Sequence, residues 1–172
     1  MDHGDEERGG PLADELPSRE PADHQVAAGA IAGLAGGAAM WLAAMIAARA
    51  DMGFLFPLRL VAASFMGEAA LDTGQTVAPV LLGTLLVAMT SVLFGLVYTS
   101  ILPEGVDVFV AVLIGIVYAA ALWAVSWFGL TRVLDPILWA AGRSIPFHML
   151  ALHALYGVGL GLLVPFLRKV LP

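Results

Sequence analysis

The stretch TVAPVLLGTLLVAMTSVLFGLVYTSIL, residues 76–102, contains no Asp, Glu, Lys or Arg and decides the fold class of this chain. An uncharged apolar run longer than about 18 residues is typical of a membrane-spanning helix, because roughly 20 helical residues cross the hydrocarbon core of a bilayer. Three further runs of this kind stand at about 26–48, 108–130 and 144–167. The sequence therefore predicts an all-α integral membrane protein, with a bundle of four transmembrane helices in a domain covering residues 26–172.

The composition agrees with a membrane protein and narrows the function classes. Hydrophobic residues make up 60% of the chain, charged residues 13%, and the mean hydropathy is +0.89. A soluble domain has about 25% charged residues. With no basic patch, nucleic acid is not expected as a partner. The chain has no cysteine, which excludes disulfides, thiolate catalysis and cysteine-ligated clusters.

Residues 1–25 carry the whole acidic excess of the chain. The net charge is −6, and the residues after this segment contain equal numbers of acidic and basic side chains. Low hydrophobicity, together with several Gly and Pro residues, predicts a disordered acidic tail. Its acidic start does not fit a secretory signal, which begins with positive charge. The tail is either a solvated leader or a docking segment for a basic partner.

The connections between the spans contain two short helices that begin with proline. The first is expected at about 56–70, where Pro57 suits the first turn of a helix and the segment is too short and polar to cross the membrane. It is either interfacial or re-entrant. The second is expected after Asp135 and Pro136, with Asp135 as its N-cap. The very short turn at 103–107 predicts that spans two and three are antiparallel neighbours.

This order of elements suggests an internal duplication into two helix–surface helix–helix repeats. Spans one and three align with each other, and so do spans two and four. The matched residues are Gly33 with Gly115, Trp41 with Trp123, Ser91 with His153, Phe94 with Tyr156 and Gly95 with Gly157. Because spans one and three cross the membrane in the same direction, the two repeats are expected to be parallel.

Small residues recur at four-residue spacing in every span, which places them on one face of each helix. Such residues let membrane helices approach closely enough for dispersion contacts between backbones. The stripes serve either helix packing inside the chain or an oligomer interface lining a narrow pathway. The predicted packing residues are Gly29, Gly33, Gly37, Ser91, Gly95, Gly115, Gly157 and Gly161.

His153 is the deepest ionisable side chain in the predicted spans, roughly 10 Å inside the start of the fourth span. A polar group at that depth usually faces the bundle interior and needs a partner, for which the intramembrane polar candidates are Ser91, Thr90, Tyr118 and Ser126. The interpretations are a neutral histidine bonded between helices, a proton relay and a weak candidate for haem ligation. Haem held by two histidines would need the second one from another chain. We therefore predict no cofactor.

No complete catalytic or metal-binding motif stands in the sequence, and no acidic residue lies deep in a span. The sequence therefore favours a non-enzymatic structural or accessory subunit that packs against other membrane helices. Two alternatives stay open: a small oligomeric channel or transporter, and a haem or redox subunit using His153. The expected partners are the lipid bilayer and either a larger membrane complex or further copies of the chain.

The segment HALYGVGLG, residues 153–161, together with the Gly/Ala-rich first span, resembles small uncharacterised bacterial four-helix inner-membrane proteins of the YagU-like type. Ser91 departs from the pattern, because it stands where a second histidine is expected. The resemblance implies a multi-pass protein of the bacterial inner membrane and supplies no activity. Arg168 and Lys169 directly follow the fourth span, which favours cytoplasmic termini. An aromatic belt is expected at the opposite face, from Trp41, Trp123, Trp127 and Trp139.

Overall fold

The computed structural model describes residues 20–72, 74, 77–142 and 146–171. Its long helices are α1 (Glu20–Ala48), α3 (Val77–Ile101), α4 (Val108–Ala124) and α7 (Pro146–Val170). In the described part of the chain, four helices are long and apolar enough to cross a membrane. The span that begins with α4 continues through the following turn to Gly129. The prediction of an all-α protein with four membrane-spanning helices is confirmed. The chain is a multi-pass membrane protein in contact with the lipid bilayer.

Helix α1 begins earlier than the sequence suggested. Residues 20–25, assigned to the tail, are helical. Asp23 lies in the first turns of α1, where a carboxylate is favoured by the positive end of the helix dipole. The predicted disorder of residues 1–19 falls outside the described residues.

The third span ends in a π-helical segment, η2 (Val125–Thr131), followed by the short helix α5 (Arg132–Leu134). The Thr131 hydroxyl donates to the carbonyl oxygens of Ser126 and Trp127, at 2.9 Å each. Single π-turns inside α-helices are rare and concentrate at functional sites.

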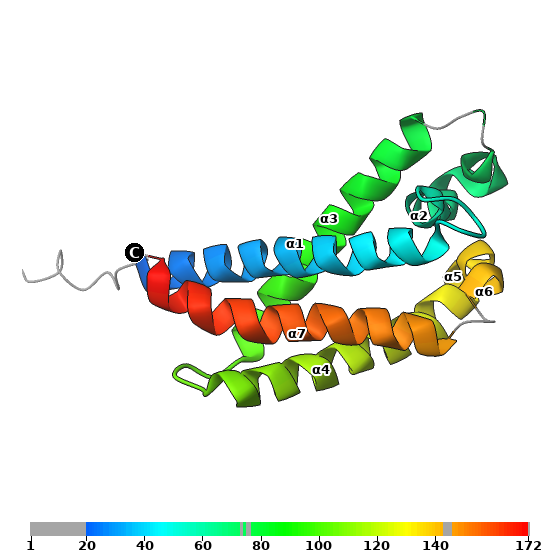
Figure 1. Cartoon of the computed structure of the whole chain (residues 1–172). Coiled ribbons are helices and arrows are strands. Elements are labelled where there is room, and N and C mark those ends of the chain that lie inside the picture. Colours follow the sequence, from blue (N-terminus) through cyan, green and yellow to red (C-terminus); the bar gives the residue numbers. More distant parts are fainter. Residues whose placement is uncertain (1–19, 73, 75–76, 143–145, 172) are drawn as a thin grey trace, which may run out of the picture.

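Both predicted surface helices are present, at the same end of the bundle (Figure 1). Helix α2 (Phe56–Met66) has Pro57 in its first turn and continues into a 3-10 turn, η1 (Gly67–Leu71). Gly67 ends α2 with a φ of 68°, a left-handed conformation that glycine adopts without strain. Helix α6 (Pro136–Gly142) is the second surface helix, and it packs on α2.

The long helices pair as α1 with α3, α4 with α7, and α1 with α7. In Figure 1, α1, α7 and α4 run side by side, while α3 crosses behind them and leaves the bundle toward its N-terminal end. The expectation that α3 and α4 are antiparallel neighbours is correct only near the turn that joins them. It is wrong for the rest of their length, because Tyr98 and Tyr118 stand between the two backbones, whereas glycines draw each of these helices to another partner.

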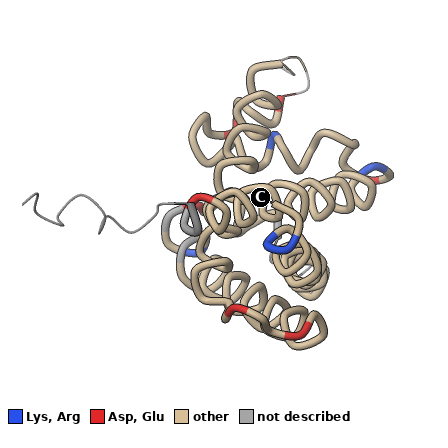
Figure 2. Tube along the Cα trace, turned by 90° about the vertical axis from the view of Figure 1, so that its left-hand side faces the viewer, with Lys and Arg blue, Asp and Glu red and all other residues tan. Residues whose placement is uncertain are grey.

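The charged residues gather at helix ends and in connections, as Figure 2 shows in a view turned by 90°. The middle of each span is free of Asp, Glu, Lys and Arg. This distribution leaves an uncharged band around the bundle, which is the surface that a bilayer requires.

Candidate functional site

Helices α1 and α3 meet in a seam with backbone contacts. A Cβ added to Gly95 would lie 2.6 Å from the Cα of Gly33, and one added to Gly33 would lie 3.0 Å from the Cα of Gly95. On either side of this crossing, Gly37 faces the Ser91 side chain and Gly29 faces Thr99. Only glycine fits at these positions, because ordinary Cβ contacts begin at about 3.4 Å.

Helices α4 and α7 meet in a second seam of the same kind. A Cβ on Gly157 would lie 2.7 Å from the carbonyl carbon of Gly115, and one on Gly161 would lie 2.7 Å from the nitrogen of Val112. The two seams together contain every predicted packing residue. The small-residue stripes are therefore used inside the chain, which supports the first of the two interpretations given above.

The two seams are equivalent under the alignment that suggested a duplication. That alignment matches Gly33 with Gly115 and Gly95 with Gly157. The structure brings Gly33 against Gly95 and Gly115 against Gly157. The alignment compares α1 with α4 and α3 with α7, whereas the contacts join α1 to α3 and α4 to α7, so the two observations are independent. They support two repeats, α1–α2–α3 and α4–α6–α7.

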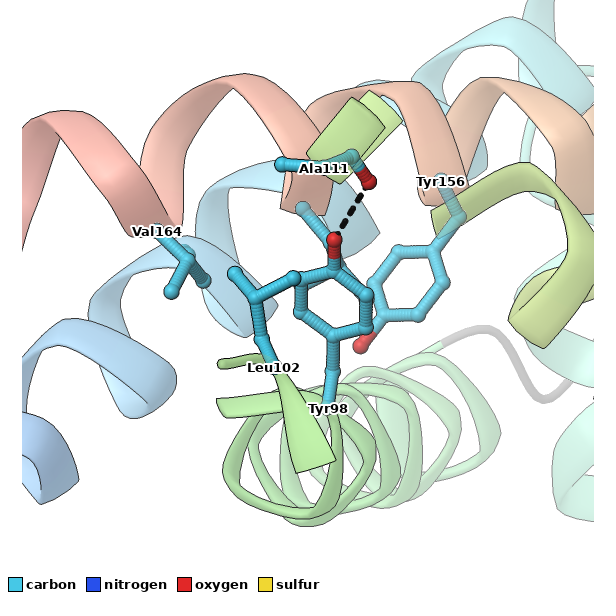
Figure 3. Packing of buried hydrophobic residues seen from close by; sticks show 7 residues of the cluster. Tyr98, Leu102, Ala111, Tyr156 and Val164 are labelled. Atoms are coloured by element: carbon cyan, nitrogen blue, oxygen red, sulfur yellow. Dashed lines mark hydrogen bonds between the residues drawn. The ribbon is translucent and has the colours of Figure 1, made fainter. Parts of the chain in front are cut away.

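Three tyrosines connect the interior of the bundle through their hydroxyl groups. Tyr98 of α3 donates to the carbonyl oxygen of Ala111 at 2.6 Å, as Figure 3 shows. Tyr118 of α4 donates back to that of Phe94 at 2.8 Å, and its ring centroid lies 5.5 Å from that of Tyr98. Each hydroxyl thereby finds the partner that a polar group needs away from water.

The third tyrosine, Tyr156 of α7, donates to the carbonyl oxygen of Ser91 at 2.7 Å. Tyr98 is 0% exposed and Tyr156 is 3% exposed. Of the three, the sequence reasoning selected only Tyr118 as a polar residue of the interior. The signal for the other two was available: a tyrosine in the middle of an uncharged span has a hydroxyl that must be satisfied.

His153 is bonded within its own helix. Its Nδ1 lies 2.8 Å from the carbonyl oxygen of Met149, one turn earlier. Because a carbonyl only accepts, the proton of the neutral ring is placed on Nδ1. The expected bond to Ser91 or Tyr118 on another span is not the contact that orients this ring. No group of three His, Asp or Glu side chains able to hold a metal occurs among the described residues.

Asp135 joins the two surface helices. One carboxylate oxygen accepts from the backbone N–H of Leu138 at 2.9 Å, which confirms the predicted N-cap of α6. The other accepts from the hydroxyl of Ser64 on α2. Only 9% of Asp135 is exposed. Beside it, an open hollow of about 610 Å³ is lined by Glu68, Leu71, Asp72, Pro136, Ile137 and Ala140.

Aromatic side chains cover the same end of the bundle. The rings of Trp127 and Trp139 lie 4.9 Å apart between centroids, and the Arg132 guanidinium lies 6.0 Å above the Trp139 ring. The tryptophans belong to the predicted aromatic belt. Arginine beside tryptophan is typical of residues that membrane proteins place at the headgroups, and the position of this belt at the interface stays a prediction.

Arg168 at the opposite end of the bundle caps α3. Its Nη2 donates to the carbonyl oxygen of Thr99 at 2.6 Å, and its Nη1 donates to those of Leu102 and Pro103 at 3.1 and 3.3 Å. These carbonyls include ones that a helix end leaves without an intrahelical partner. The sequence was used to predict sidedness from Arg168 and did not indicate this contact, because Arg168 and the end of α3 are far apart in the chain.

Comparison with protein-family models, curated proteins and solved structures finds no match for this chain. The resemblance to YagU-like proteins, with the bacterial inner membrane that it implies, stays a prediction.

Proposed function

We propose that this chain is a non-enzymatic accessory subunit that docks on other transmembrane helices through α3. The main support for this proposal is that polar side chains inside the spans form hydrogen bonds within the chain itself. Tyr98, Tyr118, Tyr156 and His153 all bond to main-chain carbonyls. A catalytic or transport site presents such groups to a substrate, ion or water instead. The three tyrosine bonds hold helices together and the His153 bond stays within α7, which supports a structural role.

The surface offered for docking is the outward stripe of α3. Large apolar residues follow one another at four-residue spacing and are well exposed, with Leu85 55% exposed. The stripe consists of Leu81, Leu85, Met89, Leu93 and Val97. The N-terminal half of α3 packs on α2, where Gly83 meets Leu58, and leaves the bundle (Figure 1). This half has one face on its own chain and one face available to a neighbouring helix.

The proposal is tested in the native membrane. A photoreactive amino acid replaces Leu85, and the control variant carries it at Val117 on α4, which is 69% exposed. After irradiation and gentle detergent extraction, the mass of the adducts is determined. We expect a protein adduct of fixed mass from position 85 and none from position 117.

Equal labelling at both positions, or labelling by lipid alone, would contradict docking through α3. Purified protein that releases ions or solutes from liposomes would instead favour the channel or transporter alternative. A Soret band that His153→Ala abolishes would favour the haem alternative.

A further inference from the structure

A groove opens between α1 and α3 on the side toward α2. The two helices touch where Gly37 meets Ser91 and then separate, because α3 leaves the bundle. At the surface end, α2 closes the gap: a Cβ on Gly83 of α3 would lie 2.7 Å from the carbonyl carbon of Leu58. The space between crossing point and surface helix has a volume of about 230 Å³ and is lined by all three helices.

The groove exists because small residues form part of its walls, opposite the larger ring of Trp41. Ala38 and Ala88 leave space on the two long helices, and Trp41 lies along it. The Thr84 hydroxyl in the wall is bonded to the Val80 carbonyl at 2.8 Å, so it presents little free polarity. The occupant must therefore be apolar and must enter sideways from the bilayer.

A comparison of the two repeats explains why the groove occurs in the first repeat. In the alignment of spans two and four, Ala88 corresponds to Leu150 and Ser91 corresponds to His153. Larger side chains stand at both positions in the second repeat, where α4 and α7 pack closely. The sequence difference between the repeats thus leaves a recess in one of them.

The geometry points to the acyl chain of a phospholipid as the occupant, with the lipid phosphate bound by Arg59. A transmembrane helix, about 10 Å wide, is too broad for a recess of about 230 Å³. An acyl chain is thinner and flexible. Arg59 follows Leu58 on α2 and is half-buried, and its Nε has no hydrogen-bond acceptor among the residues that the structure describes. A guanidinium at the headgroup level complements a phosphate.

Trp41 in the groove wall provides the readout, because bromine atoms on an acyl chain quench tryptophan fluorescence on contact. The full chain, with Trp123, Trp127 and Trp139 replaced by Phe, is titrated in detergent micelles with phosphatidylglycerol carrying brominated acyl chains. We expect quenching of Trp41 that saturates at one lipid per chain. Ala88→Phe fills the groove and should abolish the saturable part, whereas Leu85→Phe, on the outward stripe of α3, should leave it unchanged.

Arg59→Gln should weaken the apparent lipid affinity roughly tenfold, as expected when a hydrogen bond to a charged group is lost. If the Phe background fails to fold, native mass spectrometry of the otherwise unchanged chain counts the bound lipids for the same variants. Quenching that rises without saturation, or that Ala88→Phe does not alter, overturns the proposal. Quenching that disappears as protein concentration rises would place a second copy of the chain in the groove, which also overturns it.

Discussion

Replacing Gly95 by alanine should loosen the α1–α3 seam by an amount that the structure allows one to work out. The added Cβ would lie 2.6 Å from the Cα of Gly33 and closer still to the carbonyl oxygen of Gly29, whereas ordinary contacts begin at 3.4 Å, so the helices must separate by at least about 0.8 Å. A gap of 0.5–1 Å forfeits about a quarter to a half of each dispersion contact, worth about 0.1–0.2 kcal/mol per atom pair. Summed over the atom pairs along the seam, we expect a loss of about 1–3 kcal/mol, the range typical of overpacking.

The assay is unfolding in mixed micelles by increasing dodecyl sulfate, followed by circular dichroism, with Gly129→Ala as the matched control. A Cβ on Gly129 meets nothing within 4 Å, so this variant has the same composition change without the contact. We expect Gly95→Ala, and likewise Gly157→Ala, to lower the free energy of unfolding while Gly129→Ala does not. If Gly95→Ala proves as stable as Gly129→Ala, the argument that backbone contact holds the two helices together is wrong.

Three further substitutions test the polar contacts. Tyr98→Phe removes one buried hydroxyl bond and should cost about 0.5–1.5 kcal/mol in the same unfolding assay; no change would mean that the bond contributes nothing. Arg168→Gln should increase hydrogen exchange of the last turn of α3, which loses its cap, while exchange in α1 stays as it was. Asp135→Ala should cost about 0.5–2 kcal/mol through the lost N-cap and make α6 more sensitive to proteolysis; Asp135→Asn, which keeps a capping side chain, should recover most of it, and failure to do so would exclude the cap as the cause.

The features that could be predicted from sequence are those that depend on composition or on one local residue. An uncharged apolar run forms a spanning helix wherever it stands, so all four spans were predictable. Proline fixes its own φ, so Pro57 and Pro136 indicated where the surface helices begin. The N-cap at Asp135 is equally local, because it needs only the N–H groups that follow.

The features that could not be predicted depend on where distant side chains meet. At η2 each backbone hydrogen bond shifts by one residue, from the α-helical to the π-helical partner. The pattern of apolar residues in a span is the same for both kinds of turn, so the sequence does not distinguish them. Arg168 caps α3 only because α7 brings it there. His153 could equally have faced another helix or its own, and the backbone carbonyl one turn away proved to be its partner.

The divergence of α3 from α4 follows from an asymmetry between the two repeats. Helices α1 and α7 approach closely at Gly36 and Gly159. A Cβ added to Gly159 would lie only 3.1 Å from the Cα of Gly36. In the alignment of the repeats, Gly36 corresponds to Tyr118 and Gly159 to Val97. The matching pair, α4 with α3, therefore carries a tyrosine whose hydroxyl reaches the Phe94 carbonyl at 2.8 Å and holds the backbones apart. If two identical repeats had been kept, α3 would lie against α4 as α1 lies against α7. The tyrosine that stands in place of a glycine keeps the N-terminal half of α3 away from α4, and this leaves the outward stripe of α3 available for the proposed docking.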